Sequence, residues 1–269
     1  MNNMVEKAFI GILHFGSRQT VEALLRSIPS ALYPQIVILD HNPSCNSPLG
    51  TWTIIHDSSN PGYACGMNRL IRKALELRTS YFLGLTNDLV LHPRAIKTLI
   101  DILKNSELTG VQGILVDKES RVLTGSQRLN PYFHWVHNGF RHQLATGLQK
   151  KAIWNTDFIC GAFFGLDLQR FRCGPVFFDE DFFLYHEDIE WSLRLKAMGH
   201  LFGVSSASWA IHSESLATGG KITGRGILMR WASLRFFFIK TGQTLSYVLV
   251  SSLVFWIRML WFWKKYGLR

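Results

Sequence analysis

Cysteine is scarce in this chain, and the four cysteines include no pair spaced as C-x-x-C. Zinc sites and disulfide frameworks normally show a recognisable short spacing, so the sequence favours neither. Residues 1–7 are polar and lead directly into an apolar run, which gives no indication of a secretory signal. We therefore expect a protein of the reducing cytoplasm.

The sequence also lacks the two common phosphate-binding fingerprints. It contains no P-loop, and no G-x-G-x-x-G follows its first apolar run. No internal repeat or low-complexity linker divides residues 1–220, so we expect them to form one domain. A hydrophobic content of 47% with 18% charged residues argues against disorder, and 269 residues can bury a substantial core.

Acidic residues are absent from the last fifth of the chain. Residues 1–214 carry 20 lysines and arginines against 19 acids, whereas residues 215–269 carry nine lysines and arginines and no acid. The net charge of +10 therefore belongs almost entirely to this tail. Such a basic segment predicts an anionic partner, either a nucleic acid or a membrane surface.

Apolar runs alternate with helical patterns through the first hundred residues. The runs have the length and composition of buried strands, and they lie at 8–15, 36–39, 52–55 and 81–85. Apolar residues at helical spacing predict helices at 20–28, at 69–76 and after Pro93. This alternation is typical of an α/β fold with a mostly parallel sheet covered by helices on both faces.

The pattern becomes less regular from about Val111. Order returns with an apolar strand expected at 158–164, followed by a helix that ends near Gly199. Between these two elements, six acids lie among several phenylalanines: Asp179, Glu180, Asp181, Glu187, Asp188 and Glu190. Acids in apolar surroundings have raised pKa values and suit base or metal-ligand roles. Alternatively, the last three complement the dipole of the helix that follows.

The segment from Asn60 to Asn68 (Asn-Pro-Gly-Tyr-Ala-Cys-Gly-Met-Asn) lies between a predicted strand and a predicted helix. Glycine lets a backbone approach a ligand closely because it has no Cβ, and asparagine offers both a donor and an acceptor. About twenty residues later, Asn87 and Asp88 follow another strand, at the edge where open α/β sheets place ligands. This combination predicts an enzyme that handles a phosphorylated or sugar ligand.

Four segments carry a family resemblance. Residues 10–16 match an opening strand, and residues 37–44 resemble a V-V-D-N-x-S turn. Residues 60–68 fit N-x-G-[FY]-[AG]-x-G-x-N, and residues 161–194 fit G-A-F…F-D-E-x-F-F-x-Y-x-E-D-x-[DE]-[LW]-x-x-R almost position for position. Together they resemble the family-2 glycosyltransferases, in the rhamnosyltransferase-like branch that builds bacterial surface polysaccharides such as lipopolysaccharide. The last two motifs are the specific ones.

The resemblance implies a GT-A fold, in which a nucleotide-binding α/β half continues into an acceptor-binding half. It also implies an inverting transfer in which one carboxylate deprotonates the acceptor hydroxyl and a divalent metal, Mg²⁺ or Mn²⁺, neutralises the leaving diphosphate. By matching position, Asp188 beside Glu187 is the general base and Asp88 is a metal ligand. His212 matches a histidine that some relatives use as a metal ligand, although a lone histidine after a strand is more often structural.

The same matching implies a nucleotide-sugar site. Asp40 resembles the residue that contacts the base, although an acid at a strand end is also a common turn former. The further predicted contacts are Asn60, Gly62, Gly66, Asn68, Asn87 and Arg194. Arg194 could equally pair with Glu190 one turn earlier. Two departures, a single carboxylate in Thr86-Asn87-Asp88 and His14-Phe15-Gly16 in place of [TS]-[YF]-N, leave an inactive, nucleotide-sugar-binding relative as the alternative.

Residues 221–269 are expected to form a helical segment that associates with a membrane. Residues 245–263 are almost wholly apolar apart from Arg258, which leaves spanning, inserting and packing on the body all open. One helical stripe precedes them, formed by Ile227, Trp231, Leu234 and Phe238. Aromatics in a continuous apolar run favour a membrane over a nucleic acid. This suits a lipid-linked glycan acceptor at the inner face of the cell membrane, with dTDP-rhamnose as one candidate donor.

Overall fold

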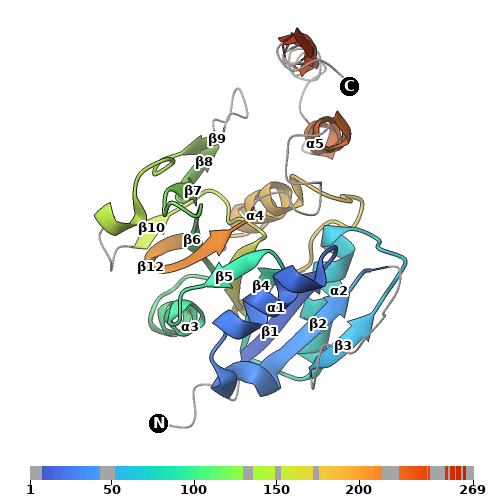
Figure 1. Cartoon of the computed structure of the whole chain (residues 1–269). Helices are drawn as coiled ribbons and strands as arrows, with labels where there is room; N and C mark the ends of the chain where they lie inside the picture. Colours follow the sequence, from blue (N-terminus) through green and yellow to red (C-terminus); the bar gives the residue numbers. More distant parts are fainter. Residues whose placement is uncertain are drawn as a thin grey trace.

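The computed structural model describes residues 8–42, 52–129, 136–148, 153–171, 176–213, 224–240 and 242, together with short pieces between 252 and 264. These residues form an α/β fold in which one central sheet lies between layers of helices (Figure 1). The predicted fold class is therefore confirmed.

The strands of the central sheet share one dominant direction. Their bounds are β1 Ala8–His14, β2 Ile36–Asp40, β3 Thr53–His56, β4 Tyr81–Thr86, β5 Leu89–Leu91, β6 Gly110–Val116, β7 Val122–Thr124, β10 Ile153–Asn155, β11 Phe163–Asp167 and β12 Phe202–His212. The order along the main path is β10-β12-β6-β11-β4-β1-β2-β3. Strands β3, β2, β1 and β4 are parallel neighbours.

Strand β11 runs antiparallel to both β4 and β6, and β12 runs parallel to β6. Strands β6 and β12 therefore point the same way as β4. The carboxyl ends of β1, β2, β4, β6 and β12 consequently share one edge of the sheet, and three predicted site residues, Asp40, Asp88 and His212, lie at or just after these ends. A separate hairpin is formed by β8 Gln127–Leu129 and β9 Val136–Asn138.

Helices cover both faces of the sheet. The helices are α1 Arg18–Ser27, α2 Tyr63–Glu76, α3 Ala95–Asn105, α4 Glu187–Ala197 and α5 Gly224–Lys240. On one face, α1 and α3 share a buried core with Ile10 and Ile12 of β1, and α3 packs on β6, β11 and β12. On the other face, α2 packs on β1, and Trp191 of α4 packs on Phe164 and Phe202. The predicted strands and helices therefore bury their apolar residues in two cores, one on each face of the sheet.

The strand predicted at 158–164 is wrong over most of its length, because β11 begins only at Phe163. Side chains bind the backbone of the preceding residues in place of a neighbouring strand. Ser192 accepts a hydrogen bond from the amide of Ile159, and Gln112 accepts one from the amide of Cys160. The apolar run is therefore a buried loop that leads into β11.

Strand β6 is not apparent from the sequence, where the pattern becomes irregular. Every residue from Gly110 to Val116 is buried, so the strand shows no alternation of polar and apolar positions. Two of its glycines leave room for aromatic rings, since a Cβ at Gly110 would overlap Phe202 and one at Gly113 would overlap Phe163.

Helix α5 packs on the α/β body, close to α4 (Figure 1). Phe237 and Phe238 are buried against Phe182, and Lys240 pairs with Asp179 at 2.9 Å and with Asp181 at 2.7 Å. Within the predicted 221–269 segment, α5 thus contacts the acidic segment before α4, and the association with a membrane stays a prediction. The predicted apolar run at 245–263 lies partly outside the described residues, and within the described part no helix has the length and hydropathy needed to cross a membrane.

Candidate active site

Asp88 and His212 come into contact at the carboxyl edge of the sheet. Asp88 lies in the turn between β4 and β5, and His212 ends β12, which pairs with β5 so that His212 stands opposite Leu89. Oδ2 of Asp88 lies 3.3 Å from Nε2 of His212, and Thr86 Oγ1 donates a hydrogen bond of 2.7 Å to Oδ1 of Asp88. The amide of Ser213 donates to the Asp88 carbonyl at 3.0 Å. A short antiparallel pairing therefore joins two residues predicted to bind a metal.

The Asp88–His212 pair has the chemistry of part of a divalent-metal site. Burial raises the pKa of Asp88, but the hydrogen bond and charge of His212 and the bond from Thr86 outweigh it, so the pKa lies below its usual value. Asp88 is therefore ionised at neutral pH. Nδ1 of His212 is buried without a hydrogen-bond partner among the described residues. Carboxylate oxygen and imidazole nitrogen are donors that Mn²⁺ accepts, and Mg²⁺ takes the former.

Two protein ligands are fewer than a metal site built by the protein alone would need. Within the described part of the chain, no group of three or more His, Cys, Asp or Glu side chains is placed to hold a metal ion. Mg²⁺ is commonly bound by one or two carboxylates together with substrate phosphates. The pair therefore fits a cation that reaches the protein together with a diphosphate ligand.

Asp188 is held at the same edge of the sheet. It lies in the first turn of α4, where its Oδ1 accepts a hydrogen bond from the Ile189 amide at 2.9 Å. Its Oδ2 accepts one from the Gly161 amide at 3.1 Å. The next residue, Ala162, accepts a bond of 3.0 Å from the amide of Thr86, which in turn contacts Asp88. The predicted base Asp188 and the predicted metal ligand Asp88 are thus linked through Gly161, its neighbour Ala162 and Thr86.

Burial raises the pKa of Asp188 above that of an ordinary aspartate. The amides of Gly161 and Ile189 act in the opposite direction, because they donate to the ionised form. A carboxylate with a raised pKa is a stronger base than an exposed one, and the two amides keep it oriented. These properties suit proton abstraction from a hydroxyl.

Glu187 has different surroundings from its neighbour Asp188. Its side chain is buried, and its Oε2 has no hydrogen-bond partner among the described residues. Burial, followed by the charge of Asp188, raises the pKa of Glu187 well above its usual value. The phenol of Tyr63 is also buried close by, and it donates to the Gly161 carbonyl at 2.5 Å. Glu187 is thus held protonated beside an ionisable Asp188.

Three histidines surround Asp40 at the ends of the first strands. Nε2 of His14 lies 4.0 Å from Oδ1 of Asp40, and Nδ1 of His56 lies 3.7 Å from Oδ2. His41 follows Asp40 directly, and its amide donates to the His14 carbonyl. Asn42 also donates to Asp40, from both its amide and its side chain. Asp40 therefore ends β2 as a turn former, which is one of the two roles expected for it, and its contact with a nucleotide base stays a prediction.

The histidines are not singled out as site residues by the sequence, although His56 directly follows a predicted strand and His41 comes two residues after another. Burial lowers the pKa of both His14 and His41, so both are neutral at neutral pH. Nδ1 of His14 and Nε2 of His41 are buried without a partner among the described residues. Their strand-end positions were the available signal, because the carboxyl ends of parallel strands collect ligand-binding side chains.

The glycines of the 60–68 segment make room for the protein itself. Gly62 has φ +99° and ψ 177°, and a Cβ there would overlap the carbonyl of Phe183. A Cβ at Gly66 would overlap Leu13 and His41. Close packing within the protein is thus one reason for these glycines, and their predicted approach to a ligand stays a prediction. Asn60, at φ +43°, forms the turn that enters α2.

Three predicted nucleotide-sugar contacts form hydrogen bonds within the protein, and their contact with a ligand stays a prediction. Asn68 is fully buried, and it exchanges hydrogen bonds of 2.8 and 2.9 Å with the backbone of Phe178. Asn87 donates to Thr20 Oγ1 at 2.5 Å. Arg194 donates twice to Glu190 and once to the Phe177 carbonyl, which is the alternative that its helical spacing offered. These side chains hold the walls of the site together, and the sequence motif does not distinguish that role from ligand binding.

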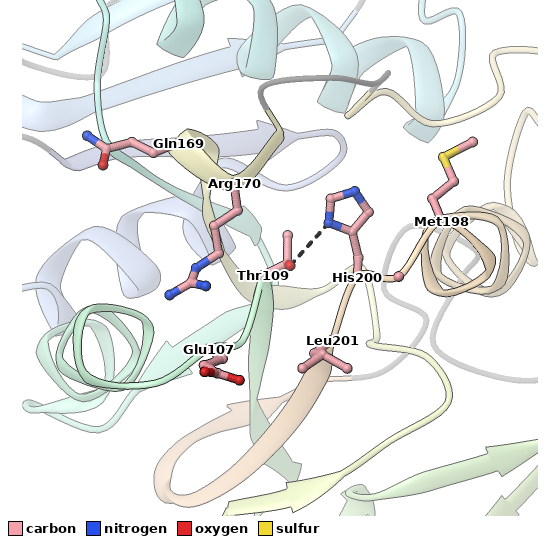
Figure 2. A pocket seen from close by; sticks show the side chains of 8 residues that line it. Glu107, Thr109, Gln169, Arg170, Met198, His200 and Leu201 are labelled. Atoms are coloured by element: carbon pink, nitrogen blue, oxygen red, sulfur yellow. Dashed lines mark hydrogen bonds between the residues drawn. The ribbon is translucent and has the colours of Figure 1, made fainter.

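A separate cavity of about 490 Å³ lies at the opposite edge of the sheet (Figure 2). Its lining includes Thr109, which precedes β6, and His200 and Leu201, which precede β12. Thr109 Oγ1 and Nδ1 of His200 are 3.1 Å apart. Arg170 also lines it but donates to Asp167 and to the Ser106 carbonyl. The cavity therefore stands apart from the carboxyl edge where Asp88 and Asp188 lie.

Comparison with known proteins supports the fold and leaves the family open. The sequence matches no protein-family model and no curated protein sequence. Among solved structures, it resembles the crystal structure of GalNAc-T7 with UDP, GalNAc and Mn²⁺, with a TM-score of 0.58 and 11% sequence identity. The match covers 77% of this chain but only 43% of that protein, so this chain corresponds to less than half of its length. The architecture described here is the GT-A fold of glycosyltransferases.

Proposed function

We propose that this protein is an inverting, metal-dependent glycosyltransferase that moves a sugar from a nucleoside diphosphate to a glycan or lipid-linked glycan. The observation that carries the proposal is the convergence of Asp88, His212 and Asp188 on one sheet edge of a GT-A fold. The motifs at 60–68 and 161–194 support the rhamnosyltransferase-like branch, with dTDP-rhamnose as one candidate donor.

The side chains present can carry out such a transfer. Asp188 would accept the proton of the acceptor hydroxyl while that oxygen bonds to the anomeric carbon of the donor. The bond from the anomeric carbon to the diphosphate oxygen then breaks, and the nucleoside diphosphate leaves. Asp88 and His212 would hold a divalent cation, which when bound neutralises the charge of the leaving diphosphate. Asp40, together with its histidines, would contact the base of the nucleotide.

Replacement of Asp188 tests the function directly. We expect Asp188→Asn to lower kcat by about 10²–10⁴-fold, because an amide cannot accept the proton. The measurement is release of nucleoside diphosphate from a panel of UDP, dTDP and GDP sugars with Mn²⁺. Asp101→Asn, at a surface ion pair on α3, is the matched control and should retain full activity. In the active protein, kcat should fall as the pH drops through the raised pKa of Asp188.

A second candidate is a relative that binds nucleotide sugars without transferring them. It is favoured by the finding that only two candidate metal ligands meet among the described residues. Calorimetry with the same donors, with and without Mn²⁺, separates the candidates. Metal-dependent binding without turnover across a full acceptor panel would support this candidate, and full activity of Asp188→Asn would contradict the first.

We further propose that the protein works at the inner face of the cell membrane. The described pieces between 252 and 264 expose large apolar side chains, including Trp256, Trp261 and Trp263. The chain beyond residue 214 carries nine basic residues and no acid. Tryptophan favours the membrane interface, and basic side chains favour anionic lipids. A lipid-linked acceptor would require the catalytic edge to lie close to that surface.

A further inference from the structure

The backbone directly before the proposed base is left-handed at two consecutive residues. Tyr185 has φ +74° and His186 has φ +65°, although neither is glycine. Such conformations are unfavourable for residues with a Cβ and persist only where the surroundings enforce them. Helix α4 begins at the next residue, and His186 provides no side-chain cap. The direction of its first turn, which carries Asp188, is therefore set from outside the helix.

Helix α5 supplies the contacts that enforce this conformation. Ser233 Oγ donates a hydrogen bond to the carbonyl of Tyr185 and lies 3.4 Å from Nδ1 of His186. The guanidinium of Arg230 lies 4.4 Å from the centre of the Tyr185 ring. Burial, followed by the charge of Arg230, lowers the pKa of His186 to about 4, so its imidazole is neutral at neutral pH. A neutral imidazole can donate its Nδ1–H to the same hydroxyl, and Ser233 then joins both left-handed residues.

The position of α5 is itself fixed against the acidic segment. Phe182 packs between the buried rings of Phe237 and Phe238 and the ring of Phe236. Lys240 pairs with Asp179 and Asp181 on the same segment. The residues of α5 that make these contacts follow Ser233 in the sequence, and Arg230 lies about one turn before it. The serine hydroxyl therefore meets Tyr185 from a helix that is anchored to the same loop.

We propose that Ser233 is a positioning residue for Asp188 and acts through the left-handed pair Tyr185–His186. The inference rests on the proposed glycosyl transfer, in which Asp188 is the base. By fixing the turn that enters α4, the Ser233 hydroxyl keeps the Asp188 carboxylate where the amides of Gly161 and Ile189 reach it. Helix α5, which follows the motif at 161–194 in the sequence, would thereby have a role in the reaction.

Two substitutions whose side chains have nearly the same shape test the role of the Ser233 hydroxyl. Ser233→Val removes it, whereas Ser233→Thr keeps it on a side chain of the same size. We expect Ser233→Val to lower kcat about 10- to 100-fold with an unchanged KM for the nucleotide sugar, because a misplacement on the order of 1 Å can cost about that much. Ser233→Thr should restore most of the activity. Ile239→Ala, at an exposed position of α5, is the control.

A measurement that needs no turnover accompanies the kinetics. The amide signal of Gly161 in an NMR titration reports the ionisation of Asp188, to which it donates. Since this bond lowers the pKa of Asp188, its weakening in Ser233→Val should move the titration to higher pH, and Ser233→Thr should not move it. If Ser233→Val does not fold, Ser233→Ala is used in both measurements.

The outcomes separate this inference from the proposed function. An active wild-type protein whose Ser233→Val variant keeps both kcat and the Gly161 titration would overturn the positioning role alone. An equal loss of activity in Ser233→Val and Ser233→Thr would also overturn it, because the hydroxyl would then not matter. A wild-type protein without transfer would overturn the proposed function, and the Gly161 titration would still decide whether Ser233 positions Asp188.

Discussion

Glu187 and Asp188 are adjacent carboxylates that the fold treats differently. Both oxygens of Asp188 accept hydrogen bonds from amides, whereas Oε2 of Glu187 is buried without a partner among the described residues. Two carboxylates in one buried site do not ionise together readily, and the proton stays on the one with fewer donors. We therefore interpret Glu187 as the protonated member of the pair and Asp188 as the base.

The buried Glu187 should make stability depend on pH. Its pKa in the folded protein lies well above the value of 4.5 expected for an unfolded chain. As the pH rises above the unfolded value, the unfolded chain releases this proton while the folded protein retains it, so folding loses stability until the folded pKa is reached. The loss is about 1.4 kcal/mol for each unit between the two pKa values. Glu187→Gln removes this titration.

Urea unfolding from pH 4 to pH 8 checks this expectation. The free energy of unfolding of Glu187→Gln, relative to wild type, should rise with pH and level off near the folded pKa. Glu76→Gln, at an exposed surface pair of α2, should show no such rise. A Glu187→Gln variant whose relative stability is constant over this range would contradict a protonated Glu187.

At the scale of elements, the entry into α2 depends on a backbone conformation that only glycine adopts easily. Gly62 is the N-cap residue of α2, and its φ and ψ of +99° and 177° lie in a region that is essentially restricted to glycine. The amide of Tyr63 donates to the Phe183 carbonyl at 2.8 Å, so this turn packs directly on the loop that precedes α4. Two motifs that are far apart in the sequence therefore meet at one glycine.

Gly62→Ala should destabilise the protein by about 1–3 kcal/mol from backbone strain alone, and by more because its Cβ overlaps the Phe183 carbonyl. Equilibrium unfolding in urea measures the change. Gly147→Ala is the matched control, because nothing lies within 4 Å of a Cβ there, and its effect should stay within about 0.5 kcal/mol. Equal stability of the two variants would show that Gly62 is not under this constraint.

The elements that the sequence predicts are those whose apolar pattern has a clear period. Helix α3 is expected from Ile96, Leu99 and Leu103, and all three are buried. Strand β6 could not be predicted, because a strand buried on both faces shows no alternation. The apolar run before β11 was wrongly predicted as a strand because a buried loop can have the same apolar composition. Its backbone amides donate hydrogen bonds to the side chains of Ser192 and Gln112 in place of a neighbouring strand.

At the scale of the whole molecule, the site depends on contacts between distant segments. The sequence places Asp88 after a strand and Asp188 at a helix start, and parallel strand order then predicts that both face one edge. The motifs do not reveal that Asn68 and Arg194 are bound within the walls of the site. Contact between Asp88 and His212 depends on the pairing of β5 with β12, which the sequence does not specify. The sequence thus predicted at which strand or helix end a site residue lies, but not which side chain it contacts.

A described piece of the chain after α5 contacts that helix. Phe255 stacks on Trp231 of α5 with ring centres 4.9 Å apart. Beyond this contact, Trp256 and Trp263 are each 57% exposed. Exposed tryptophans beside uncompensated basic charge predict binding to an anionic lipid surface, because each basic side chain near such a surface contributes about 1 kcal/mol.

The full chain should therefore bind vesicles that contain phosphatidylglycerol more tightly than vesicles of phosphatidylcholine alone, and added salt should weaken the binding. Replacing both Trp256 and Trp263 by serine should lower the affinity at least about tenfold, since the loss of 1.4 kcal/mol of apolar burial is enough for that change. Co-sedimentation measures it, with Leu77→Ser at an exposed position after α2 as the control. Equal binding to both kinds of vesicle, or an unaffected double variant, would contradict the predicted binding of these tryptophans and basic residues to an anionic lipid surface.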